Sequence, residues 1–152
     1  TIEAVGGTGL LEEKITAAEI AALRDSFAGH GDQLDVVVLA APQLSLVEMR
    51  EVASHCAGRH VKKPLIVCTS PQVYGDATRM GFVGTIEDAG GTVLQGTCFY
   101  NQYAREIGEA NGWVNLLSNS AKIVNILGGY GYRPALASMQ DCIEAAIEGK
   151  MA

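Results

Sequence analysis

The sequence predicts an α/β protein with three layers, α/β/α, in which helices cover both faces of a mostly parallel, Rossmann-like sheet. The chain of 152 residues has the length of one domain with a single core. Short apolar runs rich in β-branched residues indicate strands buried on both faces, which is typical of parallel sheets. Strands and helices alternate along the chain at intervals of about 25 to 30 residues, as they do in right-handed β-α-β crossovers.

The first predicted helix begins after Thr16. Thr16 and Glu19 have the spacing of a capping box, and Ile15 and Ile20 stand at the positions of a hydrophobic staple. The Gly-His-Gly sequence at residues 29–31 should end this helix, because glycine favours the conformation that follows a helix. A first amphipathic helix is therefore expected before the first strand.

The residues before this helix resemble a connection more than a core element. We expect residues 1–14 to be a linker from a preceding region and residues 15–152 to form a single α/β domain. The first residue is Thr1 rather than an initiator methionine. The chain is accordingly expected to be part of a longer one.

The first predicted strand spans residues 35–40, a run of mostly β-branched side chains. Pro42 and Gln43 follow it, and Ser45 and Glu48 then form a second capping box. The helix that this box begins has apolar side chains at helical spacing, which are Leu46, Met49, Val52, Ala53 and Cys56.

The remaining elements are predicted from the same signals. A strand is expected at 64–69, followed by a helix that Ser70 caps, that has Pro71 at its first position and that ends at Gly81. A short helix at 82–89, a short strand at 92–94, a loop at 96–98 and a strand at 115–117 come next. The last elements are a helix at 120–127, a Gly-rich turn at 128–131 and a helix that begins after the cap Ser138 and ends at Gly149.

Composition excludes several classes of function. A net charge of −6 argues against nucleic acid or an anionic membrane as the main partner, but it leaves small anionic substrates open. The chain has no apolar run of the roughly 18 to 20 residues that span a bilayer and no signal-peptide pattern, so a cytoplasmic location is expected.

Two common catalytic and cofactor motifs are not found in the sequence. The three histidines are scattered, so a catalytic triad has no support. The glycine pairs do not form GxGxxG after a strand, so a dinucleotide site has little support.

The carboxyl ends of the predicted strands carry the candidate binding residues. Ligands of open parallel sheets bind beyond these ends, where helix N-termini also favour anions. The candidates for a small anionic substrate are Ser45, Thr69, Ser70, Ser118, Asn119, Ser120 and Lys122. Serine and threonine after a strand are also ordinary helix caps, and this second interpretation stays open for each of them.

The four cysteines differ in their predicted surroundings. Cys56 and Cys142 fall on buried helix faces and Cys68 lies inside an apolar strand, so these thiols are expected to be inert. Cys98 lies in a Gly-Thr-Cys loop at a strand end, where it could either face a site as a thiolate or serve the structure alone. The spacing includes no CxxC or zinc-finger pattern.

Five strand-end segments together resemble the aconitase X family, in the C-terminal part of its catalytic, large-subunit region. The family pattern is Gly-x-Pro-His-x-Ser, Thr-Thr-Ser, Asp-Thr-Cys, Thr-Asn-Ser-x-Lys and Ser-x-x-x-Cys. This chain has, in the same order, the segments 40–45, 68–70, 96–98, 118–122 and 138–142, and its residues 1–4 are similar to the Thr-Pro-Glu-Ala that precedes them. Gln43 stands in place of the family histidine, Gly96 in place of the aspartate and Ser118 in place of the threonine, and residues 123–134 replace a His-Tyr-x-Pro stretch.

The resemblance implies a hydro-lyase, a dehydratase of a small hydroxylated carboxylic acid such as cis-3-hydroxy-L-proline or mevalonate 5-phosphate. It implies an iron–sulfur cluster with Cys98 as one ligand, and it places Ser118, Asn119, Ser120 and Lys122 in the wall of the site. The other cluster ligands would come from a catalytic region N-terminal to this chain, or from Cys142 or Cys68, although the periodicity argues against these two. A small swivelling domain or subunit would complete the enzyme, and this chain would be inactive alone. The alternative is a non-catalytic α/β domain for ligand binding or subunit assembly, in which the hydroxyl residues only cap helices.

Overall fold

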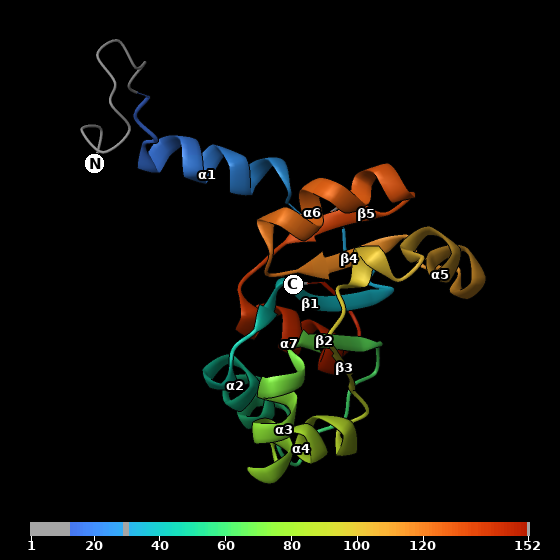
Figure 1. Ribbon diagram of the computed structural model, residues 1–152. Helices are drawn as coiled ribbons and strands as arrows, with labels where there is room; N and C mark the ends of the chain where they lie inside the picture. The colour runs from blue at the N-terminus through green and yellow to red at the C-terminus, as the bar shows by residue number, and fades with distance from the viewer. Residues whose placement is uncertain (1–12, 29–30, 152) are drawn as a thin grey trace.

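The computed structural model describes residues 13–28 and 31–151 of the chain. Five parallel strands form one sheet in the order β3-β2-β1-β4-β5, and helices lie on both of its faces (Figure 1). The predicted three-layer α/β/α fold is therefore confirmed. The strands are β1 (Val36–Leu44), β2 (Leu65–Thr69), β3 (Thr92–Gln95), β4 (Asn115–Ser118) and β5 (Arg133–Leu136).

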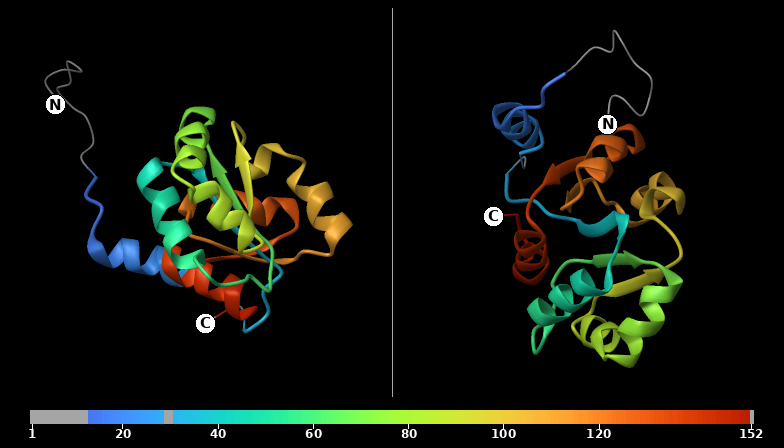
Figure 2. Two further views of the ribbon diagram at one scale, coloured as in Figure 1. Left: turned by 90° about the horizontal axis from the view of Figure 1, so that it is seen from below. Right: turned by 60° about the vertical axis from the view of Figure 1, so that its left-hand side comes forward.

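Apart from the first, the helices divide between the two faces of the sheet (Figure 2). Side chains that alternate along β1 belong to different cores: Val37 and Leu39 pack with α2, α3, α4 and α7, whereas Val36 and Val38 pack with α5, α6 and η2. The helices are α1 (Ala17–Ser26), α2 (Leu46–Cys56), α3 (Pro71–Arg79), α4 (Phe82–Asp88), α5 (Ala104–Asn111), α6 (Ala121–Leu127) and α7 (Met139–Glu148), with the 3-10 turns η2 (Phe99–Asn101) and η3 (Gly128–Tyr130).

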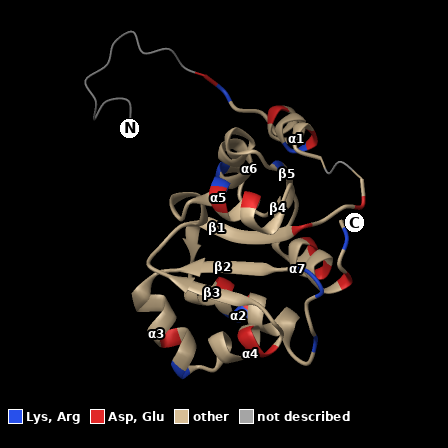
Figure 3. Ribbon diagram, turned by 90° about the vertical axis from the view of Figure 1, so that its right-hand side faces the viewer, with Lys and Arg blue, Asp and Glu red and all other residues tan. Residues whose placement is uncertain are grey.

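The Lys, Arg, Asp and Glu residues lie almost entirely on helices and connections (Figure 3). Arg133, on the edge strand β5, is the one charged residue within the five strands. This distribution follows from the burial of both sheet faces, because an unpaired charge costs several kcal/mol in such a core. None of the helices in residues 13–28 and 31–151 is long and apolar enough to cross a membrane.

The helix starts that the sequence predicts are present. Thr16 with Glu19 and Ser45 with Glu48 form complete capping boxes, and each carboxylate accepts a hydrogen bond from the backbone N–H of its cap residue. The caps predicted at Ser70 and Ser138 are also confirmed, and Ser120, the first residue of the helix predicted at 120–127, is the N-cap of α6. Capping is therefore the structural role of every predicted serine cap in the chain.

Two elements, α5 and β5, are not among those that the sequence predicts. The N-cap of α5 is Tyr103, at φ +57°, and it provides no side-chain bond, so the capping signal is missing. Strand β5 contains Pro134, which ordinarily argues against a strand. It is accommodated because β5 is an edge strand, where a missing N–H costs no sheet hydrogen bond.

Helix α1 contributes no residue to either core. Figure 1 shows it projecting away from the sheet, and Ile20 and Leu23 remain about half exposed, at 52% and 50%. Ile15 is 80% exposed, so the staple expected from the sequence does not bury it. Most of the predicted linker at 1–14, and residues 29 and 30 of the predicted helix end, lie outside the described residues.

Gly108 of α5 allows a close approach to Tyr132. A Cβ atom at position 108 would lie 2.7 Å from the Tyr132 hydroxyl oxygen and 2.9 Å from the adjacent ring carbon. Tyr132 is buried and donates a hydrogen bond to the Ala104 carbonyl at 2.7 Å, so the ring cannot shift without losing this bond. We expect Gly108→Ala to lower the free energy of unfolding by about 1 to 3 kcal/mol, measured by urea denaturation.

Gly84 of α4 provides the matched control. A Cβ added there meets no atom within 4 Å, and the residue has helical backbone geometry. Gly84→Ala should therefore leave the free energy of unfolding unchanged or raise it by up to about 1 kcal/mol, because alanine has the higher helix propensity. Equal stability of Gly108→Ala and the wild type would contradict the packing of α5 described above.

Asp35 holds the amino end of β4. One of its carboxylate oxygens accepts hydrogen bonds from Val114 N at 3.0 Å, Asn115 N at 2.7 Å and Asn115 Nδ2 at 3.0 Å. Burial opposes ionisation of this carboxyl, but the three donors and the charge of Lys63 outweigh it and hold its pKa below the ordinary value. The ionised form of Asp35 is therefore the one that stabilises the fold.

This lowered pKa gives stability a defined pH dependence. The Asp35 contribution is complete above the unfolded-state pKa of about 4 and is lost as the pH falls through the lower folded-state value. Asp35→Asn should be less stable than the wild type by about 1 kcal/mol at pH 7, with a smaller difference at pH 3, in urea titrations at both values. Asp32→Asn, at an exposed position, is the control. A difference that does not change with pH would contradict the assignment.

Candidate functional site

Strand β1 is irregular at its carboxyl end. The sequence predicts a strand that ends at residue 40, but β1 continues to Leu44. Its register with β2 is regular from Val37 to Leu39, breaks, and resumes where Leu44 pairs with Thr69. Within the break Ala41 has φ +50° and the Ala41–Pro42 peptide bond is cis. We call residues 40–43 the β1 bulge.

Three hydroxyl groups from neighbouring elements bond to β1 around this bulge. Ser118 Oγ, at the end of β4, donates to the Val38 carbonyl at 2.6 Å. Ser120 Oγ donates to the Ala41 carbonyl, and Thr69 Oγ1 donates to the Leu44 carbonyl at 2.6 Å. All three hydroxyl residues are buried, and each gives a carbonyl of β1 a hydrogen-bond donor at or beside the bulge. The bulge is thus held from both sides of β1.

The bond from Ser118 is open to a stability test. Ser118→Ala removes the donor to a buried carbonyl, and we expect the free energy of unfolding to fall by about 1 to 3 kcal/mol. Ser54→Ala is the matched control, because the Ser54 hydroxyl bonds to the Arg50 carbonyl at an exposed position of α2. Urea denaturation compares the two variants. A loss no greater in Ser118→Ala than in Ser54→Ala would contradict the bracing role.

A cavity of about 480 Å³ opens beside the β1 bulge, at the carboxyl edge of the sheet. Its walls come from three segments that are distant in sequence: the bulge itself, the connection from β3 into η2, and the first turn of α6. The lining residues are Ala41, Pro42, Gln43, Gly96, Thr97, Cys98, Tyr100, Asn101 and Lys122. The volume is in the range of sites for small molecules.

Lys122 gives this cavity a positive charge. Its ammonium nitrogen lies 5.5 Å from the centre of the Tyr100 ring, a cation–π contact that favours one position of a flexible side chain. No carboxylate is among the described residues that line the cavity. The cavity therefore favours an anionic ligand.

Gln43 joins two walls of the cavity. Its side-chain Nε2 donates a hydrogen bond of 2.9 Å to the Thr97 carbonyl, which connects the β1 bulge to the loop after β3. Gln102 Nε2 donates a second hydrogen bond to the same residue, at the Thr97 hydroxyl. These bonds fix the loop that carries Cys98.

Cys98 differs from the other cysteines in its surroundings. Its side chain is partly exposed and lines the cavity. Cys56, Cys68 and Cys142 are buried, and burial raises the pKa of these thiols to about 11, 11 and 12. They remain protonated at neutral pH, which makes them poor metal ligands.

A metal centre needs several ligands, and the described part of the chain does not assemble them. Within residues 13–28 and 31–151 no three histidine, cysteine, aspartate or glutamate side chains are grouped so that they could hold a metal ion. Cys98 has the chemistry of one iron–sulfur ligand, a thiol open to a cavity. It can therefore supply one ligand of a cluster and not a complete set.

Among the seven residues that the sequence predicts to bind substrate, Lys122 lines the cavity. Three others do not line the cavity but bond to β1 as described above, and they are Thr69, Ser118 and Ser120. Asn119 is half-buried between two of them, and Ser45 caps α2 through a bond to Glu48.

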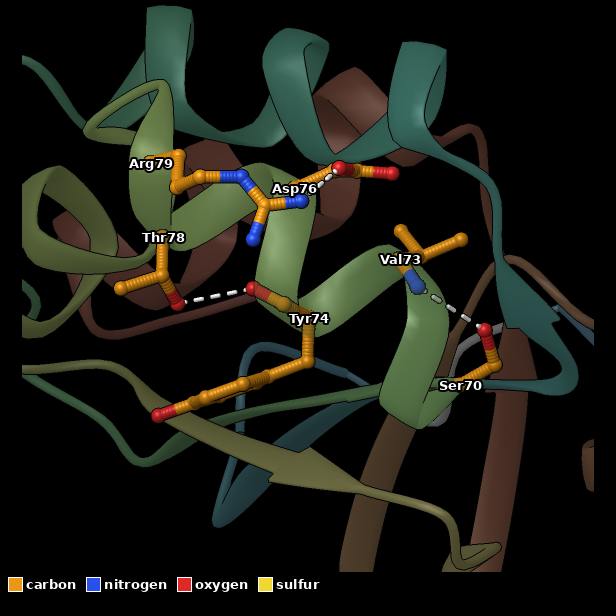
Figure 4. Close-up of polar contacts among 6 residues, drawn as sticks. All are labelled: Ser70, Val73, Tyr74, Asp76, Thr78 and Arg79. Carbon is orange, nitrogen blue, oxygen red and sulfur yellow. Dashed lines mark hydrogen bonds and ion pairs between the residues drawn. The ribbon is translucent and has the colours of Figure 1, made fainter.

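Ser70 caps α3 (Figure 4). Its hydroxyl oxygen accepts a hydrogen bond from Val73 N at 3.2 Å. The same helix carries a bond from the Thr78 hydroxyl to the Tyr74 carbonyl and an ion pair between Arg79 and Asp76. These contacts are internal to α3, and Ser70 is not among the residues that line the cavity.

Tyr100 and Asn101 line the cavity but are not among the residues that the sequence predicts for it. They follow Cys98 in the chain as part of η2, and the Tyr100 ring contacts Lys122. The sequence does contain a signal for them. An aromatic and an amide side chain come directly after Cys98, a candidate ligand, and side chains of these types commonly line binding sites.

The cavity lies at the carboxyl edge of a parallel sheet, which is where open α/β domains bind their ligands. Residues 34–148 match the sequence profile of the aconitase X third domain, which covers more than half of the chain. The chain belongs to the aconitase X family, as its motifs indicate.

Two curated relatives show how this domain fits into longer proteins. The phosphomevalonate dehydratase large subunit of Methanothermobacter thermautotrophicus is 32% identical over 76% of this chain and 28% of its own length. The cis-3-hydroxy-L-proline dehydratase of Pseudomonas aeruginosa is 30% identical over 78% of this chain and 20% of its own. The chain therefore spans between a fifth and a third of the length of these relatives.

A solved structure agrees on the fold. The crystal structure of Thermococcus kodakaraensis aconitase X in its holo form superposes with a TM-score of 0.70 at 21% identity. The match covers 90% of this chain and 36% of that one. At this level of identity the comparison supports the architecture of the sheet and its helices.

Proposed function

We propose that this chain forms one domain of an aconitase X dehydratase, a hydro-lyase that removes water from a small hydroxylated carboxylic acid. The observation that carries the proposal is the cavity, where Lys122, Cys98 and Gln43 meet from three distant segments. Two dehydratases among the relatives support it, one named for phosphomevalonate and one for cis-3-hydroxy-L-proline. Substrates of that class, mevalonate 5-phosphate and cis-3-hydroxy-L-proline, are the candidates.

In this proposal Lys122 binds the anionic group of the substrate. Its ammonium carries the only charge among the described residues that line the cavity, and it lies against the ring of Tyr100, which lines the same cavity. Ser45, Ser70 and Asn119 bind at the outer edge of the site, where helix N-termini add positive potential. The hydroxyl groups of Thr69, Ser118 and Ser120 hold the β1 bulge in place. In this way they position the part of β1 that faces the substrate.

Cys98 would supply one thiolate to an iron–sulfur cluster whose other ligands come from outside the described residues. Such a cluster supplies a Lewis acid that assists the departure of hydroxide. This requirement supports a second part of the proposal, that residues 15–152 are one domain of a longer catalytic chain and that a small domain or subunit completes the enzyme. The domain alone would then be inactive.

Activity of the complete protein tests the proposal. The protein is purified without oxygen, together with any further domain or subunit, and incubated with mevalonate 5-phosphate and with cis-3-hydroxy-L-proline. We expect dehydration of one of the two and iron and sulfide in the protein. If the protein lacks iron and dehydrates neither acid, although it binds them, the alternative of a non-catalytic binding domain would replace the proposal.

A further inference from the structure

The orientation of the Gln43 amide in the cavity is fixed by its partner. The Thr97 carbonyl can only accept a hydrogen bond, so the group that faces it at 2.9 Å must be the NH₂ of Gln43. The amide oxygen then faces away from Thr97. The chemistry of the contact therefore determines which end of the side chain is available to a ligand.

No described residue donates a hydrogen bond to the Gln43 side-chain oxygen. No side-chain oxygen or nitrogen in the described part of the chain is both buried and unsatisfied, so this oxygen is accessible to solvent. Gln43 is half-buried and lines the cavity, which makes its oxygen available to a ligand there. A carbonyl oxygen held in this way accepts a hydrogen bond from a ligand hydroxyl or ammonium group.

The position of Gln43 is held on both sides. Ser120 and Thr69 bond to the carbonyls of Ala41 and Leu44, which flank it in the chain, and its own side chain is bonded to Thr97. An acceptor held in place loses little side-chain entropy when a ligand binds, which favours selection by hydrogen bonding. Lys122 lines the same cavity, and its ammonium can bind an anionic group of the same ligand.

We propose that Gln43 is a specificity-determining residue, whose amide oxygen accepts a hydrogen bond from the hydroxyl or ammonium group of a ligand that Lys122 holds by its anionic group. This inference rests on the proposed function, and it assigns the recognition of the donor group to one residue. When an acid without a hydrogen-bond donor binds, the Gln43 oxygen loses its hydrogen bond to water and gains none in return. Such an acid should therefore bind more weakly.

Two acids that differ by a single hydroxyl test the inference. Dissociation constants of 3-hydroxybutyrate and butyrate are measured by NMR titration with the complete protein. We expect the wild type to bind the hydroxylated acid about 5- to 10-fold more tightly, the difference that one net hydrogen bond makes. Gln43→Met should reduce this ratio to about one, while Gln140→Met, at an exposed position of α7, should keep it.

Lys122→Met separates this inference from the proposed function. It should weaken the binding of both acids by the same factor and leave their ratio unchanged. A ratio that survives in Gln43→Met, or wild-type protein that binds both acids equally or neither, would overturn the role of Gln43. Affinities that do not change in Lys122→Met would instead count against the anion site of the proposed function.

Discussion

Replacing Lys122 by methionine is expected to lower kcat/KM of the complete dehydratase by about 10- to 100-fold, the loss that follows when a charged hydrogen-bonding group is removed. Methionine keeps much of the length of the side chain and removes its charge. The ammonium is the single cation among the described residues of the cavity, so no neighbour there can replace it. The variant should fold normally, because Lys122 is exposed at the surface of α6.

Lys150→Met is the matched control for this experiment. Lys150 is also exposed but is not among the residues that line the cavity. Steady-state kinetics of both variants, with mevalonate 5-phosphate and with cis-3-hydroxy-L-proline, distinguish a local effect from a change in net charge. Equal kcat/KM for Lys122→Met, Lys150→Met and the wild type would contradict the assignment of Lys122 to the anionic group.

Replacing Cys98 by alanine is expected to have the larger effect. If its thiolate holds an iron–sulfur cluster, the variant should lose most of its iron and sulfide and at least about 100-fold of its activity, since the loss of even an outer-shell partner costs 10- to 100-fold. The side chain is partly exposed, so little packing is lost. Iron and sulfide per protein, measured after anaerobic purification, report on the cluster independently of activity.

Cys56→Ala is the control for the loss of a thiol. Cys56 is buried on α2, and burial raises its pKa to about 11, so it is not expected to bind iron. The variant should be less stable in urea and should keep its iron and sulfide. Full iron content and activity in Cys98→Ala would contradict the assignment of Cys98 as a cluster ligand.

Much of the fold could be predicted because its signals are local. The apolar run at 35–40, the capping boxes at Thr16 and Ser45 and the caps at Ser70 and Ser138 each depend on neighbouring residues alone. Helix α5 and strand β5 lack such signals, since α5 has no capping side chain and β5 contains a proline. Their formation depends on tertiary contacts, such as the packing of Tyr132 against Gly108.

The site was less accessible to prediction, because its geometry depends on the β1 bulge. A strand end at residue 40 leaves Ser120 and Thr69 at an open edge, whereas the continued strand gives each of these hydroxyls a carbonyl partner, at Ala41 and Leu44. The side-chain partners of a broken register cannot be derived from spacing. Lys122 and Cys98 could be placed at the cavity from the sequence because each lies just beyond the carboxyl end of a predicted strand. Residues at these positions meet at one edge of a parallel sheet, where ligands bind.

A crystal structure of the complete protein with a bound substrate tests the location of the site most directly. Crystals grown without oxygen with mevalonate 5-phosphate and with cis-3-hydroxy-L-proline are compared with ligand-free crystals. We predict ligand density in the cavity at the carboxyl edge of the sheet, with its anionic group at Lys122 and a hydroxyl or ammonium group at Gln43. Density for the acid at another place, with this cavity holding only water, would contradict the site.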